Sequence, residues 1–559
     1  MQNYTSNSHQ SLLLPTGTAA YRCLRVSELL GNVIGFIVAV EEDDDDKSYR
    51  STLNQLARTN KELLLEPALD ELWRKQDSIV PLIKCLPKDL VVDGDRPTFR
   101  RPMFPTDWAR FKEYAARIQV LVVDDTICRS ILRDLGVYSR NFLTNLLPKL
   151  RTLTWPASSA NWLAHLPPFT NANLKSLHLR VRVRDDDLHK VFHRWGDYLP
   201  HLVKDLESLS LELVDDGKKP SHPYRYTPAP ITTSPLKLEK LRSFEWQLPL
   251  YRSVLMDLAE LRNLSRMLIR LARDEEAGEE WRGILGDGAF PELKHLTILG
   301  HDIAHCARFM EDLGRRSFET LELLADSGSS TREKEETMRV LEHVGSSLDP
   351  ETLSKLTIKA GDENTEFHGI TFDELRRTVL KFRNLTYLAL DTSCSVDGCN
   401  DDLEEFAQAW PSMETLQLGR WPYLEDTKLT IHGLKSFARH CPRLYKLVIS
   451  VDVRIADDDW ITKYDGDTAG AISSDDVEGP GYCQNTSLRH LMLGDSLIDH
   501  PLAVARFLHW MFPELDTVEG ICIGPFDKDP WDVLQDEITR LYNIAWDEER
   551  SWARLEPLC

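Results

Sequence analysis

A short apolar phrase, Leu-x-x-Leu-x-Leu or a close variant, recurs along most of this 559-residue chain. Clear copies occupy residues 150–155, 174–179, 206–211, 241–246, 293–298, 318–323, 353–358, 385–390, 413–418, 444–449 and 488–493, and weaker copies occupy 118–123, 264–269 and 515–518. Repetition at intervals of roughly 25–35 residues indicates one structural unit stacked many times. A stacked array presents a long surface for binding and differs from a compact enzyme domain.

Each phrase predicts a β-strand. Its last two apolar positions are two residues apart, so both side chains lie on one face of a pleated strand. Between the phrases the apolar residues follow helical offsets of three and four, as in Leu188–Leu199, Leu403–Trp410 and Ile431–Ala438. The alternative, a set of leucine-rich amphipathic helices, would keep one period throughout. Strands alternating with helices predict an α/β array of parallel strands.

The charge and the cysteines restrict the partners and the compartment. A net charge of −22 argues against nucleic acid or an anionic membrane as the main partner. Scattered cysteines in apolar surroundings, such as Cys85, Cys128 and Cys441, indicate buried reduced thiols and a cytoplasmic or nuclear location. The first residues lack the basic start of a signal peptide. The apolar stretch at 33–40 is too short to span a membrane, so no membrane association is expected.

The segment before the repeats has helical spacing. We expect a disordered tail at residues 1–21, a small all-α domain at 22–90, and a linker with a helix at 91–117. The first helix places six apolar residues on one face, with Ser27 as its N-cap; they are Val26, Leu29, Leu30, Val33, Ile34 and Ile37. The second helix carries Leu53, Leu56, Ala57, Leu63 and Leu64. A third helix begins at Pro67, and a fourth apolar cluster follows at Ile79–Leu86. So small a domain needs a partner or a neighbouring array to cover it, so it is either a docking module or a cap.

These segments resemble a known family. Val26–Ile37 resembles the first helix of the F-box motif, and Leu56–Trp73 with Ser78–Pro87 resembles its continuation in fungal F-box proteins. Asp107–Arg117 is similar to the linker helix of such proteins. The repeats at 118–523 resemble an irregular leucine-rich-repeat horseshoe, with parallel strands inside and helices outside. A helical cap is expected at 524–559, near Trp531–Leu541.

The resemblance implies a non-catalytic substrate receptor of a Skp–cullin–F-box ubiquitin ligase. The F-box would bind the Skp-type adaptor, and through it a cullin ligase, with Val26, Ser27, Leu29, Leu30, Val33, Ile34 and Ile37. The repeats would hold a substrate protein whose identity the sequence does not reveal. The alternative is a leucine-rich-repeat scaffold, without ligase association, whose first helices only cap the array.

A basic stripe alternates along one predicted strand. His178, Arg180, Arg182 and Arg184 share the face opposite the aliphatic residues, and later strands place Tyr387, Lys446, His490 and Met492 at positions we take as equivalent. Guanidinium groups pair well with carboxylates and phosphates, so the stripe predicts binding of an acidic or phosphorylated segment. The alternative is local neutralisation by Asp185–Asp187 and by Glu212 on the next strand.

Catalytic and metal-binding motifs are weak. The sequence has no phosphate-binding loop and no nucleophile elbow. His301 and His305 are four apart but lack the glutamate of a metalloprotease motif, which favours two helix-surface histidines. Cys394 and Cys399, with His432 or Cys441, lack the second close pair of a zinc site. We therefore expect no enzyme activity, no metal and no cofactor.

Overall fold

The computed structural model describes residues 29–30, 32–36, 48–59, 65–92, 98–123, 129–142, 145–157, 160–182, 203–214, 238–250, 252–272, 285, 288–326, 333–360, 368–392, 394–419, 428–454, 484–494, 496, 498–520 and 529–553. The contacts divide the chain into two compact units, Met1–Ser243 and Phe244–Cys559. The first unit joins the predicted helical domain to the first repeats, and the division falls inside the predicted array. The predicted tail and the predicted helix at Leu188–Leu199 lie outside the described residues.

The phrases of the first unit form parallel strands. In spatial order the strands are β1-β4-β5-β6-β7, with bounds Lys75–Gln76, Val120–Val122, Thr152–Pro156, Ser176–Arg182 and Ser208–Val214. The ladders between these neighbours are all parallel. Three short helices follow the strands, α7 at Arg129–Phe142, α8 at Ala160–Leu163 and η2 at Pro167–Phe169. The predicted strand period is therefore confirmed here.

The phrases of the second unit also form strands, in the spatial order β8-β9-β10-β11-β12-β14-β16-β17-β18-β19. Their bounds are Ser243–Leu250, Arg266–Leu271, His295–Gly300, Thr320–Ala325, Lys355–Lys359, Tyr387–Asp391, Thr415–Leu418, Lys446–Ile449, His490–Met492 and Thr517–Glu519. From β9 onward every ladder is parallel. Parallel pairing needs a crossover after each strand, which the intervening segments supply.

The strands are in register, so equivalent apolar positions stack on one another. Leu356 pairs with Leu388, and Leu388 pairs with Leu416. The side chains of Leu356, Leu388 and Leu416 are each 0% exposed. Every apolar position of every phrase is buried in the same way. Within each compact unit the core is thus an apolar layer that neighbouring repeats share.

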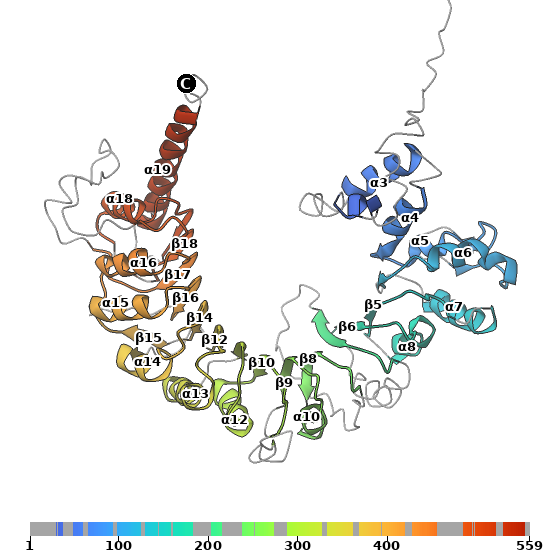
Figure 1. Cartoon of the computed structure of the whole chain (residues 1–559), viewed down its shortest axis with the longest axis horizontal. Helices are drawn as coiled ribbons and strands as arrows, with labels where there is room; N and C mark the ends of the chain where they lie inside the picture. The colour runs from blue at the N-terminus through green and yellow to red at the C-terminus, as the bar shows by residue number, and fades with distance from the viewer. Residues whose placement is uncertain are drawn as a thin grey trace, which may run out of the picture. The chain divides into compact units, whose positions relative to one another are not determined.

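Helices cover one face of the sheet in the second unit (Figure 1). They are α10 at Arg252–Ala259, α12 at Ile303–Leu313, α13 at Glu333–Ser347, α14 at Phe372–Thr378, α15 at Asn400–Ala409, η3 at Ile431–Leu434, α16 at Lys435–His440 and α18 at Pro501–Met511. The predicted apolar faces are confirmed, because Leu403, Phe406, Ala407 and Trp410 are all buried. The indole Nε1 of Trp410 donates a 3.0 Å hydrogen bond to the carbonyl of Phe382. The opposite sheet face is left for other contacts.

A second, shorter ladder, which the sequence did not predict, connects the segments before two of these helices. Strand β13 at His368–Thr371 pairs in parallel with β15 at Cys394–Asp397. Single parallel bridges continue the pattern between Cys399 and Lys428 and between Thr430 and Asp452. Successive repeats in this part of the chain are therefore joined twice, once by the main sheet and once by this second set of pairings.

The first unit begins with the expected helices, in residues 29–36, α3 at Ser48–Thr59, α4 at Leu65–Arg74 and α5 at Val80–Ile83. Helix α4 begins two residues before Pro67, where we expected its start. The short 3-10 helix η1 at Pro105–Asp107 and helix α6 at Trp108–Ala115 correspond to the predicted linker helix.

The segment at 22–90 is not all-α. Strand β1 follows α4 directly and pairs with β4, Lys75 with Val120. The backbone N–H of Gln119 also donates to the carbonyl of Arg74 at 2.9 Å. A strand of two residues is too short to show an alternation of apolar and polar side chains, so β1 could not be predicted. It covers the edge that β4 would otherwise expose. A short hairpin, β2 at Val91–Val92 with β3 at Thr98–Phe99, follows.

The C-terminal segment is a long helix, α19 at Pro530–Ala553, which packs on α18. This fits the predicted helical cap at 524–559, and Trp531, Leu534, Ile538 and Leu541 are buried. A buried ion pair joins the two helices, because Nη2 of Arg506 lies 2.9 Å from Oε1 of Glu537 and their side chains are 0% and 6% exposed. The burial of Arg506 was not predicted from the sequence.

Candidate interaction surfaces

The helix at residues 29–36 presents two apolar stripes. Leu30 and Ile34 are 4% and 3% exposed and belong to the core of the first unit. Leu29 and Val33 are 45% and 46% exposed, and Phe36 is 71% exposed. Offsets of four and seven place Leu29, Val33 and Phe36 on one side of the helix. We call these three residues the apolar stripe.

The apolar stripe refines the predicted adaptor-binding set. Leu29 and Val33 can contact a partner, whereas Leu30 and Ile34 support the helix from inside. Val26, Ser27 and Ile37 lie outside the described residues. Phe36 was not in the predicted set, although it lies on the same side of the helix as Leu29 and Val33, which were. Its spacing from Leu29 and Val33 was the signal that could have identified it.

Neighbouring helices hold this helical segment together. Leu53 and Ala57 of α3 and Ala68 of α4 are buried, and the rings of Trp73 and Tyr114 lie 4.5 Å apart between centroids. Arg117 is paired with Glu66, at 2.6 Å between Nη2 and Oε2, and with Asp70. These ion pairs tie α4 to the residue that precedes the first strand of the repeats.

The two described side chains of the predicted basic stripe, those of His178 and Arg180, contact residues on the next strand. Nδ1 of His178 lies 2.6 Å from the hydroxyl oxygen of Ser210 on β7. Nε of Arg180 lies 3.5 Å from Oε2 of Glu212, with both side chains more than half exposed. The pairing with Glu212 is the alternative we considered from the sequence. The side chain of Arg182 and all of Arg184 lie outside the described residues.

The predicted face positions on later strands come together in one row. Register places Tyr387, Thr415, Lys446 and His490 side by side on β14, β16, β17 and β18. They share the face opposite the helices with Met492, but they stand two residues earlier in the phrase than His178 does. They therefore lie on the predicted face, opposite the buried aliphatic residues of their phrases.

This row combines aromatic and cationic side chains. Nζ of Lys355 lies 4.7 Å from the ring centroid of Tyr387. His490 contacts Thr517 through Nδ1 at 2.8 Å and the Tyr445 hydroxyl through Nε2 at 3.0 Å. Lys446 is exposed and forms no ion pair with another described residue. Such a surface suits an extended segment with acidic and apolar side chains.

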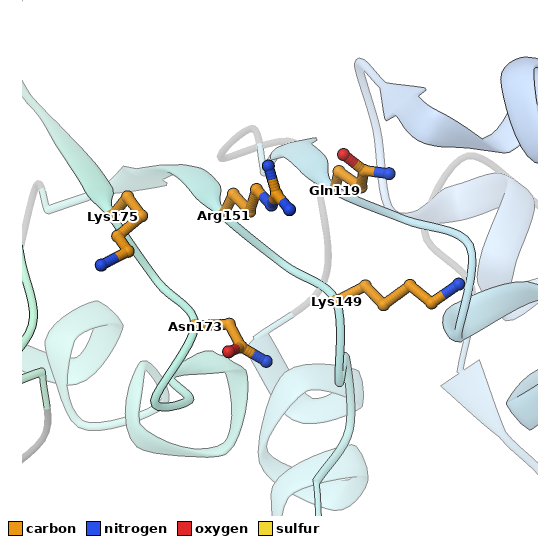
Figure 2. Close-up of a pocket in the computed structure, with 5 residues that line it drawn as sticks. All are labelled: Gln119, Lys149, Arg151, Asn173 and Lys175. Atoms are coloured by element: carbon orange, nitrogen blue, oxygen red, sulfur yellow. The ribbon is translucent and has the colours of Figure 1, made fainter. Parts of the chain in front are cut away.

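A cavity of about 400 Å³ was not anticipated from the sequence. It is lined by Gln119, Lys149, Arg151, Asn173 and Lys175 in the first unit, as Figure 2 shows. Gln119, Arg151 and Lys175 each follow the first apolar residue of their phrase. This shared position in the phrase was the sequence signal that could have identified the cavity.

The candidate metal ligands are only partly described, because the side chain of Cys394 lies outside the described residues. His305 is 3% exposed, so the expectation of two helix-surface histidines was wrong for this one. Burial raises the pKa of the Cys441 thiol to about 12. Within the described residues, no three His, Cys, Asp or Glu side chains are placed to hold a metal ion.

Comparison with known proteins finds no matching family model and no matching curated protein. None of the helices in the described part of the chain has both the length and the apolar character needed to cross a membrane.

Proposed function

We propose that this chain is a non-catalytic substrate-recognition adaptor of a Skp–cullin–F-box ubiquitin ligase. Residues 22–90 act as the F-box and bind the Skp-type adaptor. The stacked strands form an irregular leucine-rich-repeat horseshoe, with strands inside and helices outside, that binds the target protein. The apolar stripe carries this proposal, because it is exposed on a helix whose other apolar residues are already buried.

The apolar stripe has the character of a docking surface. Phe36 is 71% exposed, and Leu29 and Val33 are nearly half exposed. Single exposed apolar residues are common, but three on one side of a helix form a patch that water solvates poorly. A partner helix or groove that covered them would gain the free energy of that burial.

Charge on the apolar stripe should abolish adaptor binding. We expect Leu29→Glu with Phe36→Glu to weaken binding of a Skp-type adaptor by about 1000-fold, because each of the two central anchors contributes about 2 kcal/mol. Both positions are exposed, so the melting temperature should change little. Binding is measured with purified components by calorimetry or surface plasmon resonance.

The matched control is Gln55→Glu, an added charge at an exposed position of α3. It should bind the adaptor like the wild type. The Leu30→Glu and Ile34→Glu changes are unsuitable, since both side chains are buried and a charge there unfolds the segment. Wild-type affinity in the stripe variant, or no adaptor binding by the wild type, would refute the assignment.

Target capture should depend on the face opposite the helices. We expect Lys446→Glu combined with Tyr387→Ala to lose copurified target proteins while the adaptor stays bound. The two side chains lie in one row of the sheet, far along the chain from the apolar stripe. Quantitative mass spectrometry of partners copurified from cells compares the variant with Lys112→Glu, a charge reversal at an exposed position of α6. Identical partner lists would contradict this placement.

A scaffold without ligase association is the second candidate. Strand β1 supports it, because pairing with β4 is what a capping segment does for the edge of an array. A cap needs no adaptor, and its exposed apolar residues would have no dedicated partner. The adaptor-binding experiment separates the two functions.

A further inference from the structure

The cavity at the start of β4, β5 and β6 has the composition of an anion site. Its lining residues are Gln119, Lys149, Arg151, Asn173 and Lys175 (Figure 2). We propose that this cavity binds a phosphate dianion carried by a small molecule. The proposal concerns a surface separate from the apolar stripe and does not depend on the proposed ligase function.

The backbone places the lining side chains next to one another. The N–H of Arg151 donates to the carbonyl of Gln119 at 2.8 Å, and the N–H of Lys175 donates to the carbonyl of Arg151 at 2.8 Å. Asn173 is fixed through its side chain, whose Nδ2 donates to the carbonyl of Pro148 at 2.8 Å. The frame of the cavity is therefore set by the strand ladder before any ligand arrives.

The charge at the cavity suits a dianion. Lys149, Arg151 and Lys175 supply three positive charges. Nζ of Lys175 lies 3.0 Å from Oε1 of Glu207, which leaves a local excess of two. Lys149 and Arg151 form no ion pair with another described residue. The next carboxylate, Asp205, is itself paired with Lys240 at 2.5 Å. The Arg151 guanidinium offers the two-pronged donor geometry that phosphate oxygens accept.

The arrangement of the side chains fits a small ligand. Arg151 lies between the two lysines, whose amino groups extend to either side (Figure 2). The flexible lysine stems let both ammonium groups turn inward around an anion. A volume of about 400 Å³ is in the range of small-molecule sites. A long polyanion would also meet the repulsion of a chain whose net charge is −22.

Titration of the full chain with inorganic phosphate tests the proposal. At constant ionic strength, with chloride as the blank, we expect saturable binding in calorimetry. Arg151→Gln and Lys149→Gln should each weaken it by about tenfold, the loss expected for one charge-assisted hydrogen bond. Lys294→Gln is the matched control, since Lys294 follows Leu293 as Arg151 follows Leu150 but is paired with Glu319 at 2.7 Å.

The variants change exposed side chains, so their melting curves should match the wild type. Should Arg151→Gln fail to fold, Lys149→Gln still decides, because it leaves the backbone ladder untouched. Absence of saturation, or equal affinity in Lys149→Gln and Lys294→Gln, overturns the proposal. A phosphoserine peptide forms the second arm: binding of that peptide without binding of free phosphate overturns the small-molecule assignment.

Discussion

Glu537→Gln is expected to lower the unfolding free energy of the C-terminal helices by about 3–5 kcal/mol, the usual cost of breaking a buried ion pair. Nε and Nη2 of Arg506 lie 3.0 and 2.9 Å from Oε1 of Glu537. Arg540 adds bonds of 2.6 and 2.7 Å to the same carboxylate. A glutamine of the same shape cannot neutralise Arg506, whose side chain is 0% exposed. Urea unfolding followed by circular dichroism measures the loss.

The same variant should flatten the acid side of the stability profile. Burial raises the pKa of Glu537, but hydrogen bonds from Arg540 and Arg506 and their positive charges outweigh it and hold the pKa below the ordinary 4.5. A carboxyl with a lowered folded pKa stabilises the fold fully above its unfolded pKa and loses that effect as the pH falls through its folded pKa. The wild type should therefore lose this stability below about pH 4.5, and the variant should lack that part of the dependence.

Asp536→Asn is the matched control for both measurements. Asp536 is the exposed neighbour of Glu537 on α19, so the same loss of charge there should change stability by less than about 1 kcal/mol. Equal effects of the two variants would mean that the carboxylate of Glu537 is not buried with Arg506.

Leu388→Ala is expected to destabilise the second unit by about 2–5 kcal/mol, the range for a fully buried leucine. Leu388 is 0% exposed and stacks between Leu356 and Leu416 in the ladder. Truncation leaves a void in the apolar layer that neighbouring repeats share. The adjacent side chains of β14 point to the other face of the strand, so they cannot fill this void. Thermal melts and urea titrations provide the measurement.

Tyr387→Ala separates burial from mere proximity in the same strand. Tyr387 points to the opposite face and is only partly buried, so its truncation should cost clearly less than that of Leu388. The reverse order of effects would require a register shifted by one residue, which turns every side chain of the strand to the other face.

The strands could be predicted from the sequence because each repeat must bury apolar side chains at the same positions. Leu177 and Leu209 must both enter the same apolar layer, and in-register pairing makes that requirement identical in each unit. Strand β1 could not be predicted, because Lys75 and Gln76 pair with β4 through backbone atoms and show no apolar pattern. The β13–β15 ladder was hidden for a related reason: His368–Thr371 carries no apolar alternation.

The interaction surfaces were only partly predictable. Sequence spacing identified the helix that carries Leu29 and Val33, but not which of its two stripes faces the core. That choice depends on tertiary packing, which buries Leu30 and Ile34 and leaves Leu29 and Val33 exposed. Strand pairing also gives Arg180 its ion-pair partner. Glu212 is 32 positions away in the sequence but lies beside Arg180 in the ladder. The sequence offered Glu212 on the next predicted strand only as an alternative to binding a partner, and the ladder shows that the two side chains are neighbours.

The second ladder has a mechanical consequence for binding. Between residues 368 and 452 a change of angle between neighbouring units must disturb the main sheet and also the β13–β15 pair or the bridges of Cys399 and Thr430. We therefore expect this section to resist a change of angle between its repeats when a partner binds. Tyr387 and Lys446 belong to it, so their spacing is set in the free protein. A partner that fits this spacing binds without the free-energy cost of bending the array. A partner that does not fit must pay that cost in addition to its poorer contacts, so its affinity is lower.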